Sequence, residues 1–282
     1  MKQSIQTMLE KYPINNIQDE RNAIKEVIQE LILASLSKSG FFKKAVFCGG
    51  TALRILYGLD RFSEDLDFSL MEEDLQFDLR PYLHEAKRYM ESYGILCEIT
   101  QKKNSSNIKS AFLKSNTLEQ HIYFGANFTE SIGKNELIKI KVELDVCPPD
   151  KGKWEYKTLL LPEIYEVAIY NKETLFAGKI HSILCRLWDN RIKGRDLYDF
   201  IFYVSRNSSI NIDFLNNAMI QTGHLDKGNL LTLDQVKIML KDKFSNINYK
   251  LAIEDVRPFI KDIDSLNYWN SNFFISLLDR IK

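Results

Sequence analysis

Two aspartates one residue apart, downstream of a glycine pair, form the strongest chemical signal in this chain of 282 residues. The segment Gly49-Gly50-Thr51 ends a short apolar run, and Asp65 and Asp67 follow after a predicted short helix and a loop. Residues two apart on a strand point to the same face, so both carboxylates point to one place while Leu66 and Phe68 face a core. Two such oxygen ligands suit Mg²⁺, and glycines let a backbone approach a phosphate. This spacing predicts metal-dependent chemistry on a nucleotide.

A further pair of acidic residues lies on a predicted strand at residues 137–146, where polar and apolar residues alternate from 139 to 146. The polar face of this strand carries Lys139, Lys141, Glu143 and Asp145, and the other face is entirely apolar. Either Glu143 or Asp145 can supply the third carboxylate of a metal site from a neighbouring strand. The alternative is an ordinary half-exposed strand whose surface charges balance.

A lysine on a predicted helix, followed by an Arg-Asp-x-x-Asp segment, is the second strong signal. Its residues are Lys179, Arg186, Arg195, Asp196 and Asp199. Lysine offers a point charge to a triphosphate, and arginine offers a planar fork to phosphate oxygens. The two aspartates lie on one helix face, where they can orient the cations or take a proton from an acceptor hydroxyl. A network of ion pairs between helices is the alternative interpretation.

The motif residues resemble those of a known family. Residues 49–53 and 61–68, Gly-Gly-Thr-Ala-Leu and Arg-Phe-Ser-Glu-Asp-Leu-Asp-Phe, are similar to the first motif of the polymerase-β-like nucleotidyltransferase superfamily. More specifically they resemble the AbiEii/AbiGii toxins, and the Arg-Asp-x-x-Asp segment resembles the second half of that family's pattern. The resemblance implies an α/β nucleotidyltransferase domain with a mixed sheet, followed by a mostly helical domain. It also favours Glu143 as the third metal ligand, with Asp145 close behind.

The same resemblance implies a reaction and its partners. A toxin of a bacterial toxin–antitoxin or phage-defence system, restrained by a cognate antitoxin, would transfer a nucleoside monophosphate from an NTP to an acceptor hydroxyl. One or two Mg²⁺ ions would be required, and tRNA or a protein side chain is the expected acceptor.

The site residues that the resemblance implies fall into three overlapping groups. The expected catalytic residues are Asp65, Asp67, Glu143, Lys179, Asp196 and Asp199. The expected substrate-binding residues are Gly49, Gly50, Thr51, Arg61, Ser63, Lys179 and Arg195. The expected metal ligands are Asp65, Asp67, Glu143 and Asp145.

Two other functions use the same residues. The chain could bind a nucleotide or RNA without turnover, or it could modify a small-molecule hydroxyl such as that of an antibiotic. The intact Asp65/Asp67 pair argues against a module without turnover, because a retired enzyme tends to lose its metal ligands. The Arg-Asp-x-x-Asp segment favours the toxin family over a small-molecule transferase.

Composition excludes several classes of protein. The 38 basic and 38 acidic side chains balance, which argues against a generally basic, nucleic-acid-coating surface. Apolar runs fall short of the ~20 residues that a membrane helix needs, and the sequence after Met1 contains no apolar signal core. We therefore expect a cytoplasmic protein without a membrane partner.

The cysteines and histidines show no spacing typical of a zinc site. The cysteines are far apart in apolar surroundings, and we expect reduced thiols that pack as small buried side chains. The histidines are expected to form no cluster and to be structural or surface residues. These residues are Cys48, Cys97, Cys147, Cys185, His84, His121, His181 and His224.

The elements that would position these residues divide near Pro148-Pro149 into an α/β domain at residues 1–150 and a helical domain at 151–282. In the first domain, helices are predicted at 16–38, 51–57 (with Thr51 as N-cap) and 79–93. Strands are predicted at 45–48, 66–70, 95–100, 109–114, 121–126 and 137–146. In the second domain, helices are predicted at 163–170, 173–189, 195–205, 212–222, 234–244 and 269–281.

Overall fold

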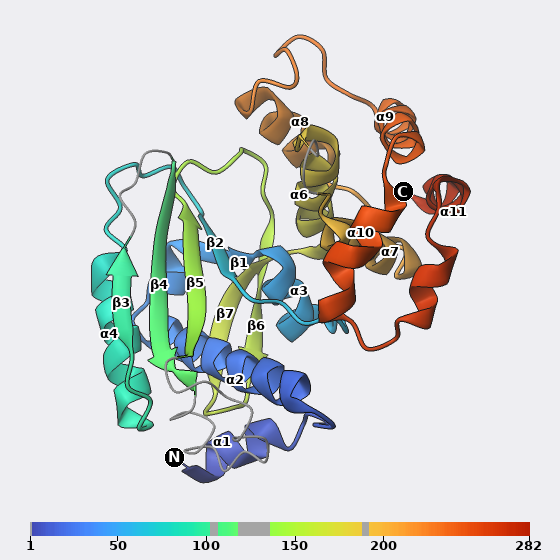
Figure 1. The fold of residues 1–282 in the computed structure, drawn as a ribbon. Helices are drawn as coiled ribbons and strands as arrows, with labels where there is room; N and C mark the ends of the chain where they lie inside the picture. The colour runs from blue at the N-terminus through green and yellow to red at the C-terminus, as the bar shows by residue number, and fades with distance from the viewer. Residues whose placement is uncertain (1, 102–106, 118–135, 188–191) are drawn as a thin grey trace. The chain divides into compact units, whose positions relative to one another are not determined.

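The structure, a computed structural model, describes residues 2–101, 107–117, 136–187 and 192–282 (Figure 1). The chain forms two compact units. Unit 1 comprises Met1–Ala52, Ser63–Pro148 and Glu155–Ile169, and unit 2 comprises Leu53–Phe62, Pro149–Trp154 and Tyr170–Lys282. The division predicted near residue 150 is therefore crossed twice: residues 53–62 group with the helical unit, and residues 155–169 group with the α/β unit.

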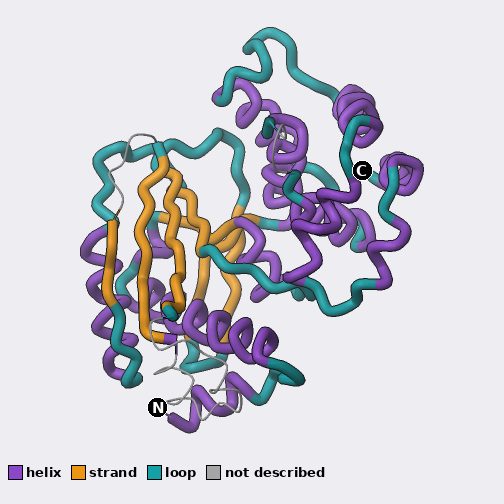
Figure 2. The backbone as a smooth tube through the Cα atoms, viewed as in Figure 1, coloured by secondary structure: helices purple, strands orange, loops and turns teal. Residues whose placement is uncertain are grey.

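Unit 1 is built on a seven-stranded sheet in the order β3-β4-β5-β2-β1-β7-β6. The strands are β1 (Ala45–Cys48), β2 (Leu66–Leu70), β3 (Glu98–Gln101), β4 (Ile108–Asn116), β5 (Leu137–Asp145), β6 (Trp154–Leu159) and β7 (Tyr165–Tyr170). Neighbours β1/β2, β3/β4 and β4/β5 are antiparallel, whereas β2/β5 and β1/β7 are parallel, so the expected mixed sheet is confirmed. Figure 2 shows that these strands, which come from separate segments of the chain, lie side by side in one sheet.

Two strands at one end of the sheet order differ from the prediction. The helix predicted at residues 163–170 is wrong, because β7 occupies this segment and pairs with β1. Five of its six residues are buried, so its apolar residues form a nearly continuous run that periodicity cannot distinguish from a buried helix. β6 was not predicted, since it is largely exposed and lacks an alternating pattern. The strand predicted at 121–126 lies outside the described residues.

The other elements that the structure describes in unit 1 are helical. They are α1 (Lys2–Leu9), α2 (Ile17–Lys38), the 3₁₀ helix η1 (Phe41–Lys43), the first residues of α3 (Gly49–Tyr57) and α4 (Arg80–Ser92). Asn16 caps α2, because its side-chain oxygen accepts hydrogen bonds from the backbone N–H groups of Gln18 and Asp19. α3 begins at Gly49 rather than at Thr51, so the prediction of Thr51 as the N-cap is wrong.

The two faces of the sheet differ sharply at β2 and β5. Leu66, Phe68, Val142 and Leu144 are at most 2% exposed, and the alternate residues are half-buried and polar apart from the buried Ser69. The Phe68 ring meets the edge of the Phe41 ring of η1 at a centroid distance of 5.1 Å. This apolar core fixes which face of β2 and β5 carries the carboxylates, because shifting either strand by one residue would exchange its faces.

Unit 2 contains the remainder of α3 and the helices that follow β7. These are α6 (Lys172–Cys185), α7 (Gly194–Ser205), α8 (Ile212–Gln221), α9 (Leu233–Ser245), α10 (Tyr249–Val256) and α11 (Ser271–Ser276). The Phe176 ring on α6 stacks on the Tyr203 ring of α7 at 4.6 Å, and the buried Phe200 packs against Phe244 of α9. Aromatic packing of this kind holds α6, α7 and α9 together.

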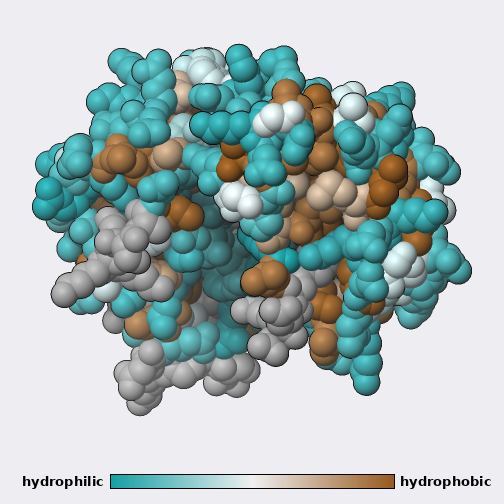
Figure 3. Space-filling view, turned by 90° about the horizontal axis from the view of Figure 1, so that it is seen from above, coloured by the Kyte–Doolittle hydropathy of each residue, from teal (hydrophilic) through white to brown (hydrophobic). Residues whose placement is uncertain are grey.

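On the face drawn in Figure 3, hydrophilic residues make up most of the surface, and hydrophobic residues lie in separate groups among them. Among the described residues, no helix is both long enough and apolar enough to cross a membrane.

Candidate active site

The pairing of β2 with β5 brings two predicted metal ligands side by side. Asp67 lies directly opposite Glu143 in this parallel pair, and Ser69 lies opposite Asp145. Neighbouring strands of a sheet lie about 4.7–4.9 Å apart, so residues in register on one face are close neighbours. The register therefore places Glu143 nearer than Asp145 to the Asp65/Asp67 pair, which begins at the N-terminal end of β2.

Gly49 allows the Asp67 carboxylate to lie against the start of α3. Gly49 has a φ of +75°, and a Cβ atom there would lie 2.2 Å from Asp67 Oδ2 and 3.0 Å from Asp67 Cβ. Only glycine permits both this left-handed backbone and this close approach. The first glycine of the sequence motif is thus required by the position of a carboxylate, in addition to any later approach of a phosphate.

Thr51 connects the glycine turn to the other aspartate of the pair. Its hydroxyl is fully buried and donates a hydrogen bond to the backbone carbonyl of Asp65. The helix α3 is thereby tied to the residue that precedes β2 by one position. In this structure the Thr51 hydroxyl positions the Asp65 backbone, and its contact with substrate stays a prediction.

The surroundings of Glu143 and Asp145 differ. Glu143 accepts a hydrogen bond from the Ser110 hydroxyl of β4 at 3.0 Å, and its other oxygen lies 2.7 Å from Lys141 Nζ. Asp145 accepts a hydrogen bond from the backbone N–H of Cys147, but burial outweighs this bond and raises the pKa of its carboxyl.

These residues fit a hard divalent cation by donor type. Asp65, Asp67, Glu143 and Asp145 offer only carboxylate oxygens, and all four are partly exposed on one side of the sheet. Oxygen ligands of this kind suit Mg²⁺. Glu143 is paired with Lys141 through one carboxylate oxygen in this structure, so a metal ion would share this carboxylate with the lysine or displace it.

In unit 2 the predicted lysine and aspartates meet. Lys179 on α6 lies with its Nζ 2.6 Å from Asp196 Oδ1 and 2.8 Å from Asp199 Oδ2, both on α7. Arg186 reaches the other oxygen of Asp196 at 2.8 Å. The Asp196 and Asp199 carboxylates thus share one face of α7, as their spacing predicted, and they hold the Lys179 ammonium between them.

Arg61 completes this network from the segment between α3 and β2. Its Nε and Nη2 donate to the two oxygens of Asp199 at 2.6 and 2.7 Å, and its Nη1 donates to the backbone carbonyl of Phe62. Arg61 is 3% exposed and Asp199 is fully buried. This bidentate pair explains why residues 53–62 group with the helical unit, a contact that no sequence pattern suggested.

The pairing sets the charge state of the network. Burial alone would raise the pKa of the Asp199 carboxyl, but Arg61 and Lys179 together bring that pKa below its ordinary value. Burial likewise disfavours the charged form of Lys179, yet Asp196 and Asp199 raise the pKa of its ammonium above the ordinary value. Both residues are therefore charged at neutral pH.

Two other predicted substrate-binding residues lie elsewhere. Arg195 stacks over the Phe259 ring at 4.3 Å and lies 3.9 Å from Asp255 of α10. In unit 1, Ser63 offers its backbone carbonyl to the side-chain amide of Gln29 on α2. None of the contacts described for these two residues joins either of them to the Lys179 network.

Sequence reasoning missed the packing role of Gly194, which precedes the Arg-Asp-x-x-Asp segment. A Cβ atom at Gly194 would lie 1.8 Å from the backbone oxygen of Ala252 on α10. The start of α7 therefore packs directly on the α10 backbone. A glycine immediately before a helical motif is the signal that could have indicated such a close approach.

Together, the mixed sheet, the glycine turn and the paired carboxylates define a nucleotidyltransferase. The chain matches the family described as "Nucleotidyl transferase AbiEii toxin, Type IV TA system" over residues 31–271. It therefore belongs to the AbiEii nucleotidyltransferase toxins of type IV toxin–antitoxin systems, as its motifs predicted.

Solved structures of low sequence identity share the fold. MenT4, a nucleotidyltransferase toxin from Mycobacterium tuberculosis H37Rv, aligns with a TM-score of 0.60 at 15% identity, over 99% of this chain and 89% of that chain. JHP933 from Helicobacter pylori aligns with a TM-score of 0.53 at 19% identity, over 92% of this chain and 91% of that chain. No curated protein sequence matches this chain.

Replacing Gly49 by alanine tests the contact with Asp67. We expect Gly49→Ala to lower the free energy of unfolding by at least about 1–2 kcal/mol, the cost of the left-handed backbone, and to abolish toxicity because Asp67 is displaced. Gly58→Ala is the matched control, since Gly58 has a φ of +78° and nothing lies within 4 Å of an added Cβ. Urea unfolding and growth arrest on induction are the measurements. Equal toxicity of the two variants would contradict the proposed role of Gly49.

Replacing Asp199 by asparagine tests the buried ion pair. Asp199→Asn leaves Arg61 without its charge partner, and we expect a loss of about 3–5 kcal/mol in the free energy of unfolding at neutral pH. Because the folded-state pKa of Asp199 is depressed, its contribution is present above the ordinary value of 3.8 and is lost as the pH falls below it. The difference in the free energy of unfolding between wild type and variant should therefore become smaller at acid pH. Urea unfolding over a pH series measures it, with Glu91→Gln, which removes an exposed pair with Lys87, as the control. A difference that is constant with pH would refute this assignment.

Proposed function

We propose that this toxin transfers a nucleoside monophosphate from an NTP to an acceptor hydroxyl, with Mg²⁺ held by Asp65, Asp67 and Glu143. The observation that carries this proposal is the register that sets Asp67 opposite Glu143, with Gly49 leaving space for the Asp67 carboxylate. When bound, Mg²⁺ would neutralise phosphate charge and activate the attacking oxygen. Asp145, one position further along the same face, is the alternative third ligand.

The residues of unit 1 have separate tasks in this proposal. Asp65 and Asp67 provide the negative charge that attracts the cation, and Thr51 keeps the backbone of Asp65 in place. Lys141 neutralises Glu143 until a cation replaces it. The N-terminal turn of α3 carries Gly49 and Gly50, and its backbone N–H groups suit a phosphate.

The network of unit 2 is proposed to bind phosphate. In the ion pairs that the structure describes, Arg61, Lys179 and Arg186 face the carboxylates of Asp196 and Asp199, so three cations share two anions among these residues. Lys179, at 14% side-chain exposure, is the member that we assign to phosphate. Asp199 is fully buried and held by two cations, so we assign it to positioning Lys179 and Arg61 rather than to accepting a proton.

The remaining assignments follow from the family. We propose tRNA as the acceptor, with a protein side chain as the next candidate, and a cognate antitoxin that restrains the activity in the cytoplasm during phage defence. Arg195 and Ser63 remain proposed substrate contacts, to be tested by substitution alongside the metal ligands.

Label transfer from each NTP, with Mg²⁺ and total RNA, tests the reaction. We expect wild-type protein to label tRNA, and Asp65→Ala with Asp67→Ala to lose roughly 10³-fold or more in rate, because removing metal ligands costs several kcal/mol of transition-state stabilisation. Glu72→Ala, which removes an exposed acid of the same unit, should keep the wild-type rate. No transfer to any RNA or protein, with nucleotide binding retained, would instead support a module without turnover.

Two substitutions identify the third ligand. Glu143→Gln should reduce transfer by roughly 10²-fold or more, whereas Asp145→Asn should stay within about tenfold of wild type. Lys141→Met is the control, because it removes the Lys141–Glu143 ion pair but leaves the Glu143 carboxylate in place. This variant should retain activity if Glu143 acts through the metal. Initial rates over a Mg²⁺ titration are the measurement. The reverse ranking of the two acidic variants would assign the site to Asp145.

A further inference from the structure

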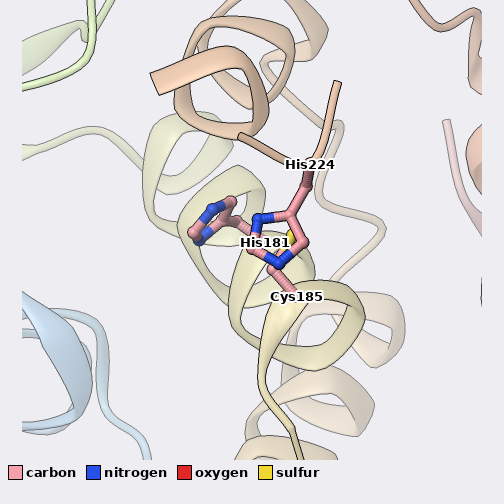
Figure 4. A group of neighbouring side chains, drawn as sticks. All are labelled: His181, Cys185 and His224. Atoms are coloured by element: carbon pink, nitrogen blue, oxygen red, sulfur yellow. The ribbon is translucent and has the colours of Figure 1, made fainter. Parts of the chain in front are cut away.

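A second group of potential metal ligands lies in unit 2, away from the residues assigned above. His181 and Cys185 are four residues apart on α6 and share one helix face, and His224 follows the end of α8. One ligand atom from each, an imidazole nitrogen or the Cys185 sulfur, lies within 4.8 Å of the others. Figure 4 shows the three side chains converging. The expectation that the histidines form no cluster is therefore wrong.

The Thr222 hydroxyl orients both imidazole rings. Its oxygen lies 3.0 Å from His181 Nε2 and 2.9 Å from His224 Nδ1. Because the hydroxyl donates its own proton to the backbone carbonyl of Ala218 at 2.9 Å, its lone pairs are free to accept from both rings. Each neutral ring then donates one N–H to Thr222 and keeps a lone pair on its other nitrogen. Histidines that bind metals are commonly oriented by a second hydrogen bond of this kind.

We propose that His181, Cys185 and His224 bind a transition-metal ion, with Zn²⁺ as the best match, at a site separate from the carboxylates of unit 1. Imidazole and thiolate are donors that Zn²⁺ and copper ions accept, and they are unsuited to Mg²⁺, which prefers oxygen. Three protein ligands leave a fourth tetrahedral position for solvent, since His224 is exposed.

Metal binding at this group would be coupled to the loss of a proton. Burial, with smaller contributions from His224 and Arg186, lowers the pKa of His181, so its ring is neutral at physiological pH. Burial raises the pKa of the Cys185 thiol to about 11, and the nearby Lys243 opposes that rise. The thiol must therefore lose its proton when the metal binds, and one proton is released to solvent for each ion.

The site would connect two packed helices of unit 2. α6 packs against α8, and the metal would join the C-terminal half of α6 to the third residue after the end of α8. Lys179 lies two residues before His181 on the same helix. A metal ion bound to the folded state alone stabilises it by mass action, so we infer that Zn²⁺ stiffens the helix that carries Lys179.

Metal titration of the full-length chain after treatment with a chelator tests the proposal. We expect one Zn²⁺ per chain by calorimetry, with release of about one proton, and a thiolate-to-cobalt absorption band with Co²⁺. His224→Ala, whose side chain is exposed, should keep the fold and weaken Zn²⁺ binding at least tenfold, and Cys185→Ser should abolish the cobalt band. Thr222→Val should weaken binding roughly 10- to 100-fold through the lost orientation of the rings. His84→Ala, an exposed histidine of α4, is the control and should bind as wild type does.

The outcome is independent of the proposed transfer reaction. Asp65→Ala with Asp67→Ala should keep the thiolate-to-cobalt band even if it abolishes activity or if no transfer is ever observed. A wild-type protein that gives no such band, or a band that survives in Cys185→Ser, would overturn the proposal. Equal Zn²⁺ affinity of wild type and His224→Ala would do the same.

Discussion

The contact between the Asp67 carboxylate and the backbone of Gly49 is the constraint on which the α/β unit depends. Cys48, the last residue of β1, pairs with Asp67 of β2, so β1 ends beside this aspartate. The left-handed Gly49 then turns the chain directly into α3. Every further feature of the carboxylate face follows from this register, including the position of Glu143 on β5 opposite Asp67.

The helical unit depends on a different interaction, the burial of Asp199 with Arg61. A buried carboxylate is costly unless cations and hydrogen bonds satisfy it, and Arg61 and Lys179 together provide both. The same arrangement presents Lys179 with its charge maintained. The ion pairs with Asp196 and Asp199 thus keep Lys179 charged although it lies among apolar helices. A network of ion pairs between helices and the proposed phosphate site would therefore use the same residues.

The local sequence pattern predicted the strands that have one buried apolar face and one polar face. The alternation along β5 and the apolar residues around Asp67 were sufficient to place those strands and to group their carboxylates. β7 was mistaken for a helix because it is buried on both sides. The partner of Arg61, 138 residues away in the chain, has no local signal at all. The same holds for His224, which reaches Cys185 only because α6 and α8 pack together.

The neutral sequence conceals local charges of opposite sign. On the polar face of β2 and β5, Asp65, Asp67, Glu143 and Asp145 outnumber the two lysines of β5, Lys139 and Lys141. In the ion pairs described for the Lys179 network, three cations face two carboxylates. Zinc generally binds a given site more tightly than magnesium does, so affinity alone does not sort the two ions. Donor chemistry does: four carboxylates favour the hard ion that accompanies phosphates, and an imidazole–thiolate group retains the softer one. Under the two proposals, the carboxylates of unit 1 would hold the ion that accompanies the NTP, and the imidazole–thiolate group of unit 2 would hold a separate ion.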